Sequence, residues 1–188
     1  MACMLSTMQE VPFSVARILE FGTTAHANTK CTTWRASGAE ETTFAEIGAR
    51  AAAFAHALHS DLGIDGDQRV STLLYNCAEH IEVMFAVAAK GAVFNPLNVQ
   101  LMADQIAYVV NHSESEVVVA DPRLAEKLGK ILQDCPTVRA VAFTGIAPLD
   151  DAASHLPDTV QVHSYEQLLD GRPTSYPWPE LPENTAAA

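Results

Sequence analysis

Between about residue 68 and residue 169, short apolar runs alternate with segments of helical period. We expect strands at Arg69–Tyr75, Ala92–Phe94, Glu116–Ala120, Val138–Thr144 and Val160–His163. Helices are expected at Cys77–Lys90, 103–112, Pro122 to about Asp134, and Ser164–Leu169, with a loop over Gly145–Asp158. The run Val117-Val118-Val119 is apolar on both faces, as in strands covered by helices on each side. This order predicts an α/β fold with a mostly parallel sheet flanked by helices.

Local signals set the expected helix ends. Thr43 and Glu46 have the spacing of a capping box before a long helix that Gly63 closes. Asn76, followed by Glu79, is expected to cap the next helix, and Gly91 is expected to end it. Pro96 places 95–98 in a loop, because a residue before proline avoids helical geometry.

The two ends of the chain differ from this body. Residues 11–29 read as an amphipathic helix that ends at Gly22, plus a connector, and 30–43 read as a hairpin turning at Ser37–Gly38. Four prolines in 171–182 predict a linker over the surface, with Tyr176 and Trp178 as anchors. We therefore divide the chain into an N-terminal amphipathic segment (1–29), an α/β subdomain (30–170) and a proline-rich linker (171–188).

Charge and hydropathy narrow the class of protein. The formal net charge is −12, which argues against nucleic-acid binding, since phosphate contacts need clustered Lys and Arg. No apolar run approaches the length of a membrane span, and the first residues lack the features of a secretory signal. We expect a cytoplasmic protein.

Other site chemistries are weakly supported. The four cysteines are far apart in sequence, and Cys77, at a helix start, is either a packed side chain or a reactive thiol. His56 and His59 could hold a metal but lack a third nearby ligand, so an exposed helix face is the simpler interpretation and we predict no metal site. The sequence contains no G-x-G-x-x-G, no phosphate-binding P-loop motif and no G-x-S-x-G.

Several short pieces together, in their order and spacing, resemble the acyl-CoA ligases of the acyl-adenylate-forming superfamily. They are Gly66–Val70, Asn76–Glu82, Gly91–Val93, Asn95–Leu101, Ile106–His112 and the lead-in Pro182–Ala188. The similarity extends from about residue 40 to the end of the chain. In that family a glycine-rich phosphate loop comes next, so we expect it to follow Ala188.

The resemblance implies a reaction in two steps. A fatty acid and ATP give an acyl-adenylate and pyrophosphate, with Mg²⁺ screening the phosphates, and the thiol of coenzyme A then displaces AMP. The implied catalytic residues lie beyond this chain, so we predict no catalytic residue within it, no bound cofactor and no ligase activity for the 188 residues alone. The expected tasks are to form one wall of the acyl or coenzyme A channel and to support subunit association, with a homodimer formed through 1–29.

By the same resemblance, the candidates for contact with the nucleotide end of coenzyme A are Asn98, Val99, Gln100, Arg123 and Lys127. The last two lie four residues apart at the start of one expected helix, where two cations suit an anion. A solvated surface face is the alternative. The family often has Arg at the position of Gln100, and Gln lacks that charge-assisted hydrogen bond.

Two other functions stay open. The chain could be a stand-alone binding or scaffold domain derived from such a ligase, in which case a natural stop follows Ala188. It could also be an unrelated doubly wound nucleotide-binding protein, which would bind NAD or FMN despite lacking the glycine fingerprint.

Overall fold

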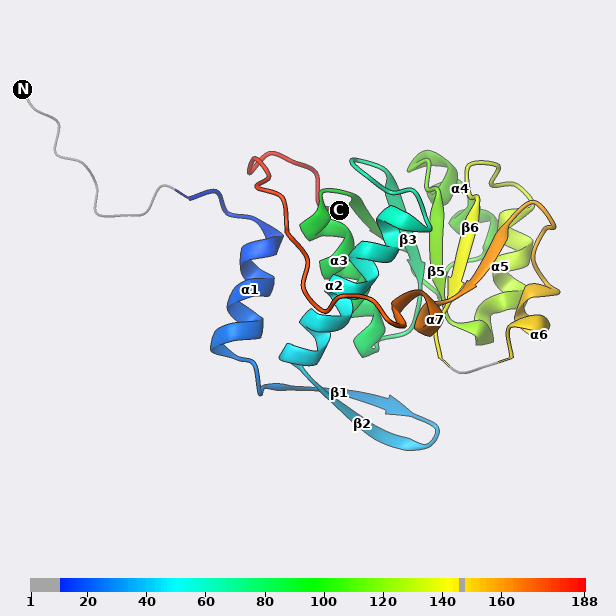
Figure 1. Ribbon diagram of the computed structural model, residues 1–188. Coiled ribbons are helices and arrows are strands. Elements are labelled where there is room, and N and C mark those ends of the chain that lie inside the picture. The colour runs from blue at the N-terminus through cyan, green and yellow to red at the C-terminus, as the bar shows by residue number, and fades with distance from the viewer. Residues whose placement is uncertain (1–10, 146–147) are drawn as a thin grey trace, which may run out of the picture.

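A five-stranded parallel sheet forms the centre of the molecule in a computed structural model that describes residues 11–145 and 148–188. The strand order is β4-β3-β5-β6-β7, and helices cover both faces (Figure 1). The strands are β3 (Arg69–Leu73), β4 (Val93–Pro96), β5 (Val117–Ala120), β6 (Ala140–Phe143) and β7 (Gln161–Ser164). The predicted fold class, a mostly parallel sheet flanked by helices, is confirmed.

Alternating side chains of the buried strands supply two separate cores. Val117 and Val119 of β5 face one cluster, which contains Phe54, while Val118 and Ala120 face the other. Every residue of β5 and β6 is buried. Strands this apolar on both faces need a helix layer on each side, which is what the alternating sequence specifies.

The helices divide between the two faces. Helices α2 (Phe44–Ser60), α3 (Ala78–Lys90) and α7 (Tyr165–Leu169) contribute to the first core, and α4 (Ala103–His112), α5 (Ala125–Leu132) and α6 (Leu149–Ala153) contribute to the second.

The predicted capping box is confirmed, because the Thr43 hydroxyl accepts from the Glu46 N–H while the Glu46 carboxylate accepts from the Thr43 N–H. Gly91 ends α3 at φ 95°, and Ser164 caps α7, as predicted.

A partly buried ion network joins the helices of the first layer. The Arg50 guanidinium on α2 donates to Glu82 on α3 at 2.8 Å and to both carboxylate oxygens of Glu166 on α7. Tyr165 donates its hydroxyl to the second oxygen of Glu82 at 2.9 Å. Burial raises the pKa of Glu82, while Arg50 and Tyr165 oppose that rise. Each oxygen of this buried carboxylate therefore has its own donor.

The N-terminal elements lie beside this body. Helix α1 (Val15–Ala25) packs on α2 and α3, and strands β1 (Lys30–Arg35) and β2 (Gly38–Thr43) form the predicted hairpin. The expected end at Gly22 is wrong, because the helix continues to Ala25. Gly22 instead permits close approach of the Phe44 ring, which a Cβ there would meet at 3.2 Å. Residues 1–10 of the predicted N-terminal segment lie outside the described part.

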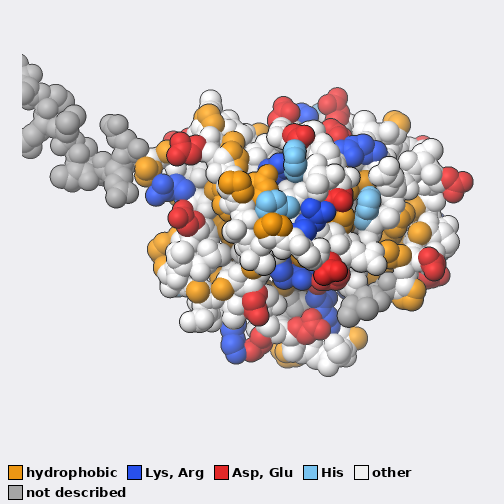
Figure 2. All heavy atoms as spheres, in the orientation of Figure 1, with side chains coloured by type: hydrophobic (Ala, Val, Ile, Leu, Met, Phe, Trp, Pro, Cys, Tyr) orange, Lys and Arg blue, Asp and Glu red, His pale blue; other side chains and the backbone are white. Residues whose placement is uncertain are grey.

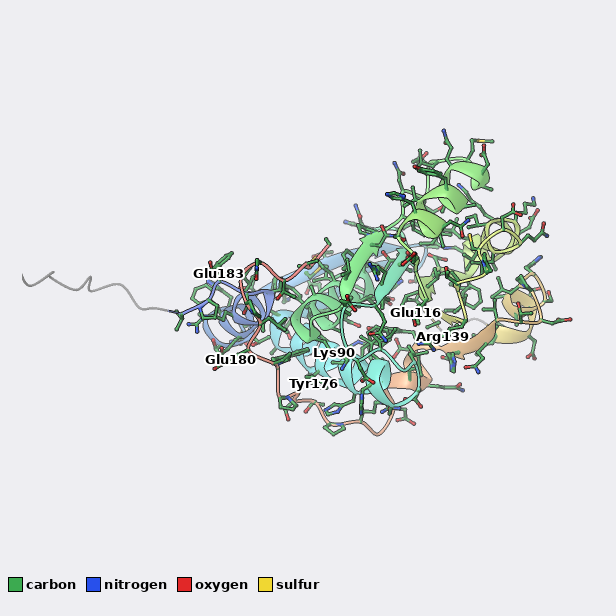
Figure 3. All side chains as sticks on the ribbon, turned by 90° about the horizontal axis from the view of Figure 1, so that it is seen from above. Lys90, Glu116, Arg139, Tyr176, Glu180 and Glu183 are labelled. Atoms are coloured by element: carbon green, nitrogen blue, oxygen red, sulfur yellow. The ribbon has the colours of Figure 1, made fainter. Side chains whose placement is uncertain are left out.

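The C-terminal stretch runs over α2 and α3. Tyr176 and Trp178 pack against the first core, which confirms both predicted anchors. Lys90 donates to the Tyr176 hydroxyl at 3.1 Å, and Figure 3 shows the two side chains close together. At the far end, the Ala187 carbonyl accepts from the Phe94 N–H of edge strand β4. The tail thus pairs with the edge strand of the sheet. The division of the chain at residues 29 and 170 stays a prediction.

Three predicted elements are corrected. Strand β4 extends through Asn95 and Pro96, which had been assigned to a loop; proline is tolerated there because β4 is an edge strand. The expected loop over 145–158 contains α6. The single helix expected from Pro122 is a 3₁₀ turn, η1 (Pro122–Leu124), followed by α5. Within the described residues, no helix combines the length and apolarity needed to cross a bilayer.

Candidate functional site

The sheet order creates a crevice at the carboxyl ends of the strands. From β3 the chain passes first to β4 on one side and then to β5 on the other, so the strand order reverses between β3 and β5. In open α/β sheets, ligands bind outside the carboxyl ends of the strands at such a switch point. The candidate site is therefore where the loops after β3, β5 and β6 meet.

A hollow of about 270 Å³ lies at this edge. Tyr75 follows β3, Arg123 follows β5 and Thr144 follows β6, and Trp34 of the hairpin also lines the hollow. The Trp34 side chain is exposed, at 80%, and Tyr75 is partly exposed, at 43%. Two accessible aromatic rings and a guanidinium offer stacking and anion contacts together.

Arg123 is held in a defined position. Its guanidinium lies 4.9 Å from the centre of the Tyr75 ring and donates to both oxygens of Asp121. Burial opposes ionisation of Asp121, but the hydrogen bonds and charge of Arg123 prevail and lower its pKa. The Asp121 carboxylate also accepts from the Arg123 N–H at 2.9 Å, which caps the 3₁₀ turn. The side chain of Arg123 stays 70% exposed, so the cation remains reachable from solvent.

Lys127 has a different role. Its ammonium donates to the carbonyl oxygens of Val99 at 2.8 Å and Leu101 at 2.5 Å. In the same loop, the Asn98 side chain accepts from the Gln100 N–H at 2.9 Å. Lys127 therefore fixes the shape of the loop between β4 and α4.

The five predicted coenzyme A contacts thus fall into two groups. Asn98, Val99 and Gln100 lie in one loop, and Lys127 of α5 reaches this loop with its side chain. Arg123 lies apart, on the 3₁₀ turn with Asp121 and Tyr75, because the expected single helix is broken at Leu124. Sequence reasoning missed Trp34, Tyr75 and Asp121. The signal that could have found Tyr75 and Asp121 is their position directly after strands predicted to be parallel, because ligands bind at the carboxyl ends of such strands.

A second, more apolar pocket of about 350 Å³ lies between the hairpin, α3 and β4. Cys31, Cys77, Met84 and Phe94 line it together with His80. Burial first, and then the charge of Glu79, raise the pKa of the Cys77 thiol to about 12. The thiol stays protonated at neutral pH, which agrees with a packed rather than a reactive cysteine. Burial also lowers the pKa of His80, whose Nε2 lies 2.9 Å from the Thr72 hydroxyl.

The start of α3 is held from outside the helix. The expected cap at Asn76 is wrong, because the cap position is Cys77 and no side chain there bonds the helix. The hydroxyl of Thr33 on β1 instead accepts from the Ala78 N–H at 3.0 Å. Thr33 is buried and lines both pockets. The hairpin is therefore fixed to the helix that borders the candidate site.

The two histidines considered as metal ligands are engaged elsewhere. The His56 ring nitrogen pairs with the Ser175 carbonyl, and His59 pairs with Asp65. Among the residues that the structure describes, no group of three His, Cys, Asp or Glu side chains could hold a metal ion.

Comparison with known proteins identifies the relatives of this fold. The sequence model of the AMP-binding enzyme family matches residues 22–184. The chain belongs to the AMP-binding enzyme family. It is 27% identical over 186 residues to a medium-chain-fatty-acid–CoA ligase of Ectopseudomonas oleovorans, and 26% identical over 186 residues to a 3-methylmercaptopropionyl-CoA ligase of Ruegeria lacuscaerulensis.

The match covers nearly all of this chain but only part of each relative. It spans 98% of the chain and 33–34% of those two ligases. A long-chain-fatty-acid–CoA ligase of Thermus thermophilus is 38% identical over 98 residues. The crystal structure of an anthranilate–CoA ligase superposes with a TM-score of 0.78 over 94% of this chain, at 18% identity. This chain therefore has the fold of one segment of an adenylate-forming enzyme, about a third of the length of its curated relatives.

Thr33→Val should weaken the docking of the hairpin on α3. Valine has nearly the same shape but cannot accept a hydrogen bond, so the buried Ala78 N–H loses its partner, at a cost of about 1–3 kcal/mol. Urea unfolding measures this change. Thr32→Val, in the same strand but exposed, is the matched control and should shift the free energy of unfolding by less than about 0.5 kcal/mol. Equal effects of the two variants would contradict the assigned cap.

Proposed function

We propose that this chain is the N-terminal part of an ATP-dependent fatty-acid–CoA ligase. The observation that carries the proposal is the AMP-binding family match over 22–184, together with ligase relatives aligned over nearly the whole chain. The names of these ligases share carboxylate–CoA ligation and differ in the acid. In the proposed reaction, the fatty-acid carboxylate attacks the α-phosphorus of ATP and releases pyrophosphate. The coenzyme A thiol then attacks the acyl carbonyl, loses its proton and expels AMP.

The chemistry of that reaction is proposed to reside outside these residues. Binding of ATP would need a glycine-rich phosphate loop, which the sequence lacks, and the described residues contain no group of three side chains that could hold a metal ion. We propose that the phosphate loop and the metal ligands follow Ala188 in a longer polypeptide. The present chain would then act as scaffold and channel wall.

The carboxyl edge of the sheet is the part of this wall proposed to meet coenzyme A. Arg123 offers an exposed cation beside the Tyr75 ring, which suits a phosphate next to a base. The tied loop at 98–100, held by Lys127, would border the nucleotide, with Gln100 giving a neutral contact. This assignment places Lys127 as a positioning residue and Arg123 as the charged contact.

A stand-alone binding or scaffold domain is the second candidate. The observation that favours it is the tail, since Ala187 pairs with edge strand β4 and Tyr176 and Trp178 pack against the first core. A coding sequence that continues past Ala188 into a glycine-rich loop supports the ligase. A natural stop codon supports the separate domain.

We further propose that α1 mediates association into a homodimer. Phe13, Ile18 and Phe21 are exposed at 74%, 43% and 61%, and Figure 2 shows apolar side chains at the surface of the α1 end of the molecule. Side chains of this size gain about 1.5–3 kcal/mol each when fully buried, so a matching surface on a second copy would be stabilising. The predicted cytoplasmic location stays a prediction.

The isolated 188-residue chain should show no ATP–pyrophosphate exchange with any fatty acid. The reason is that the sequence has no phosphate loop and that the described residues have no group of three side chains that could hold a metal ion. Exchange of labelled pyrophosphate into ATP, measured with acids of two to eighteen carbons, checks this. A rate of ATP–pyrophosphate exchange above that of buffer alone would contradict the proposal that the residues for adenylation lie outside this chain.

In the longer ligase, Arg123→Gln should raise the KM for coenzyme A by about tenfold, because a charge-assisted phosphate contact contributes about 1.5–3 kcal/mol. The rate of ATP–pyrophosphate exchange should not change, since adenylation precedes the entry of coenzyme A. Lys130→Gln, an exposed α5 variant whose charge pairs with Glu126, is the control. An equal change in both half-reactions would indicate a structural role for Arg123.

Sedimentation equilibrium of the chain should reveal a dimer that Phe21→Glu dissociates, because the substitution places a charge in the proposed apolar contact. Tyr108→Glu alters an equally exposed aromatic side chain, at 69%, on a different helix and should leave the dimer intact. A monomeric wild-type chain at all concentrations would refute the role given to α1.

A further inference from the structure

The apolar pocket of about 350 Å³ between the hairpin, α3 and β4 adjoins the carboxyl-edge hollow. Among the described residues, its lining contains no Lys, Arg, Asp or Glu side chain. Cys31, Ile81 and Met84 each pack against the first core and also line this pocket. All three are only partly buried, so a ligand that covered them would remove apolar surface from water.

The polar groups of the pocket are uncharged, and two of them already have partners within the protein. The Thr33 hydroxyl accepts from the Ala78 N–H, and the His80 Nε2 lies 2.9 Å from the Thr72 hydroxyl. Burial lowers the pKa of His80 and raises the pKa of Cys77 to about 12, so the imidazole and the thiol are neutral at pH 7. A charged group placed among them would lose hydration without gaining a partner. The pocket therefore favours an uncharged, apolar group.

The pocket extends along one face of α3. Cys77, Ile81 and Met84 are spaced four and then three residues apart, which places them on the same side of the helix. The helix rises about 10 Å from the first to the last of them. Phe94 of β4, whose ring centre lies 5.7 Å from that of His80, also lines the pocket. An extended chain advances about 1.2 Å per bond, so about eight to ten carbons would span this face.

The pocket meets the carboxyl-edge hollow at the start of α3. Thr33, Asn76 and Cys77 line both cavities. Asn76 is exposed, and its side-chain amide can donate two hydrogen bonds. A carboxylate at this junction would keep its contact with water and gain an amide donor, while the chain attached to it lies in the apolar pocket.

We propose that this pocket binds the aliphatic chain of a linear carboxylic acid of about eight to ten carbons. The terminal methyl group lies near Met84 and the carboxylate near Asn76. The choice of a linear acid rests on the proposed ligase function, which the inference deepens by locating the acid on this chain. The carboxylate then faces the hollow in which coenzyme A is proposed to bind. A benzoate ring is shorter than the helix face and leaves part of the apolar lining in water.

Calorimetric titration of the whole 188-residue chain with sodium octanoate at pH 7 should show one saturable site. The expected dissociation constant is on the order of 1 mM or tighter. In the series butanoate, hexanoate, octanoate and decanoate, each added methylene should tighten binding about threefold to fourfold. Benzoate should bind at least about tenfold more weakly than octanoate. Absence of saturable binding, equal binding of all acids, or tighter binding of benzoate would overturn the proposal.

These titrations contain neither ATP nor coenzyme A. A failure to bind octanoate would therefore remove the acid site from this chain, while the ATP–pyrophosphate exchange of the longer ligase judges the proposed function separately.

Cys31→Phe places a ring in the pocket and should weaken octanoate binding at least about tenfold. Ala39→Phe, at an exposed position of the same hairpin outside the pocket lining, is the matched control and should bind as the wild type does. In the wild-type chain, nuclear Overhauser contacts should join the terminal methyl group of octanoate to the Met84 methyl group, and its carboxyl end to Asn76. Contacts with Phe21 on the exposed face of α1 instead would place the acid on the surface and contradict the assignment.

Discussion

Burial of β3, β5 and β6 on both faces is the constraint on which the rest of the structure depends. A strand such as Val117–Ala120, with every residue buried, needs one helix layer for its odd residues and another for its even ones. The crossover from β3 to β4 runs through α3 on the first face, and the crossovers through α4, α5 and α6, which move the other way along the sheet, run over the second face. This is what crossovers of one hand require, because a reversal of direction changes the face that they cover. The order β4-β3-β5-β6-β7 follows from this arrangement, and it places the switch point between β3 and β5. The position of the candidate site at the carboxyl edge is therefore a consequence of core packing.

Local sequence predicted those parts of the fold that depend on near neighbours. The capping box of Thr43, the left-handed stop at Gly91 and the apolar run of β5 each involve residues a few positions apart, and all three were predicted. The errors concern interactions across the chain. The cap of α3 comes from Thr33, 45 positions before Ala78, so the nearby Asn76 was a reasonable but wrong choice. Pro96 could be placed in a strand only by knowing that β4 lies at the edge.

The same limit applies to the candidate sites. Lys127 and Arg123 were nominated by the resemblance to acyl-CoA ligases, and their spacing placed them on one helix face. The break at Leu124 and the carbonyls of Val99 and Leu101 instead give them different surroundings. The ion network of the first helix layer was not predicted at all. Arg50, Glu82 and Glu166 meet from three helices, and nothing in their separate sequence contexts marks them as neighbours. Glu79 was interpreted as part of a helix start, and only the three-dimensional structure shows its ion pair with Arg35 of the hairpin.

The hairpin connects these sites physically. Thr33 lines the apolar pocket and the carboxyl-edge hollow, and its hydroxyl bonds the start of α3. On the same strand, Arg35 pairs with Glu79 of α3 and also lines the hollow beside Arg123. The hairpin therefore supplies one wall of each site, and its position on α3 depends on one buried hydroxyl and one ion pair.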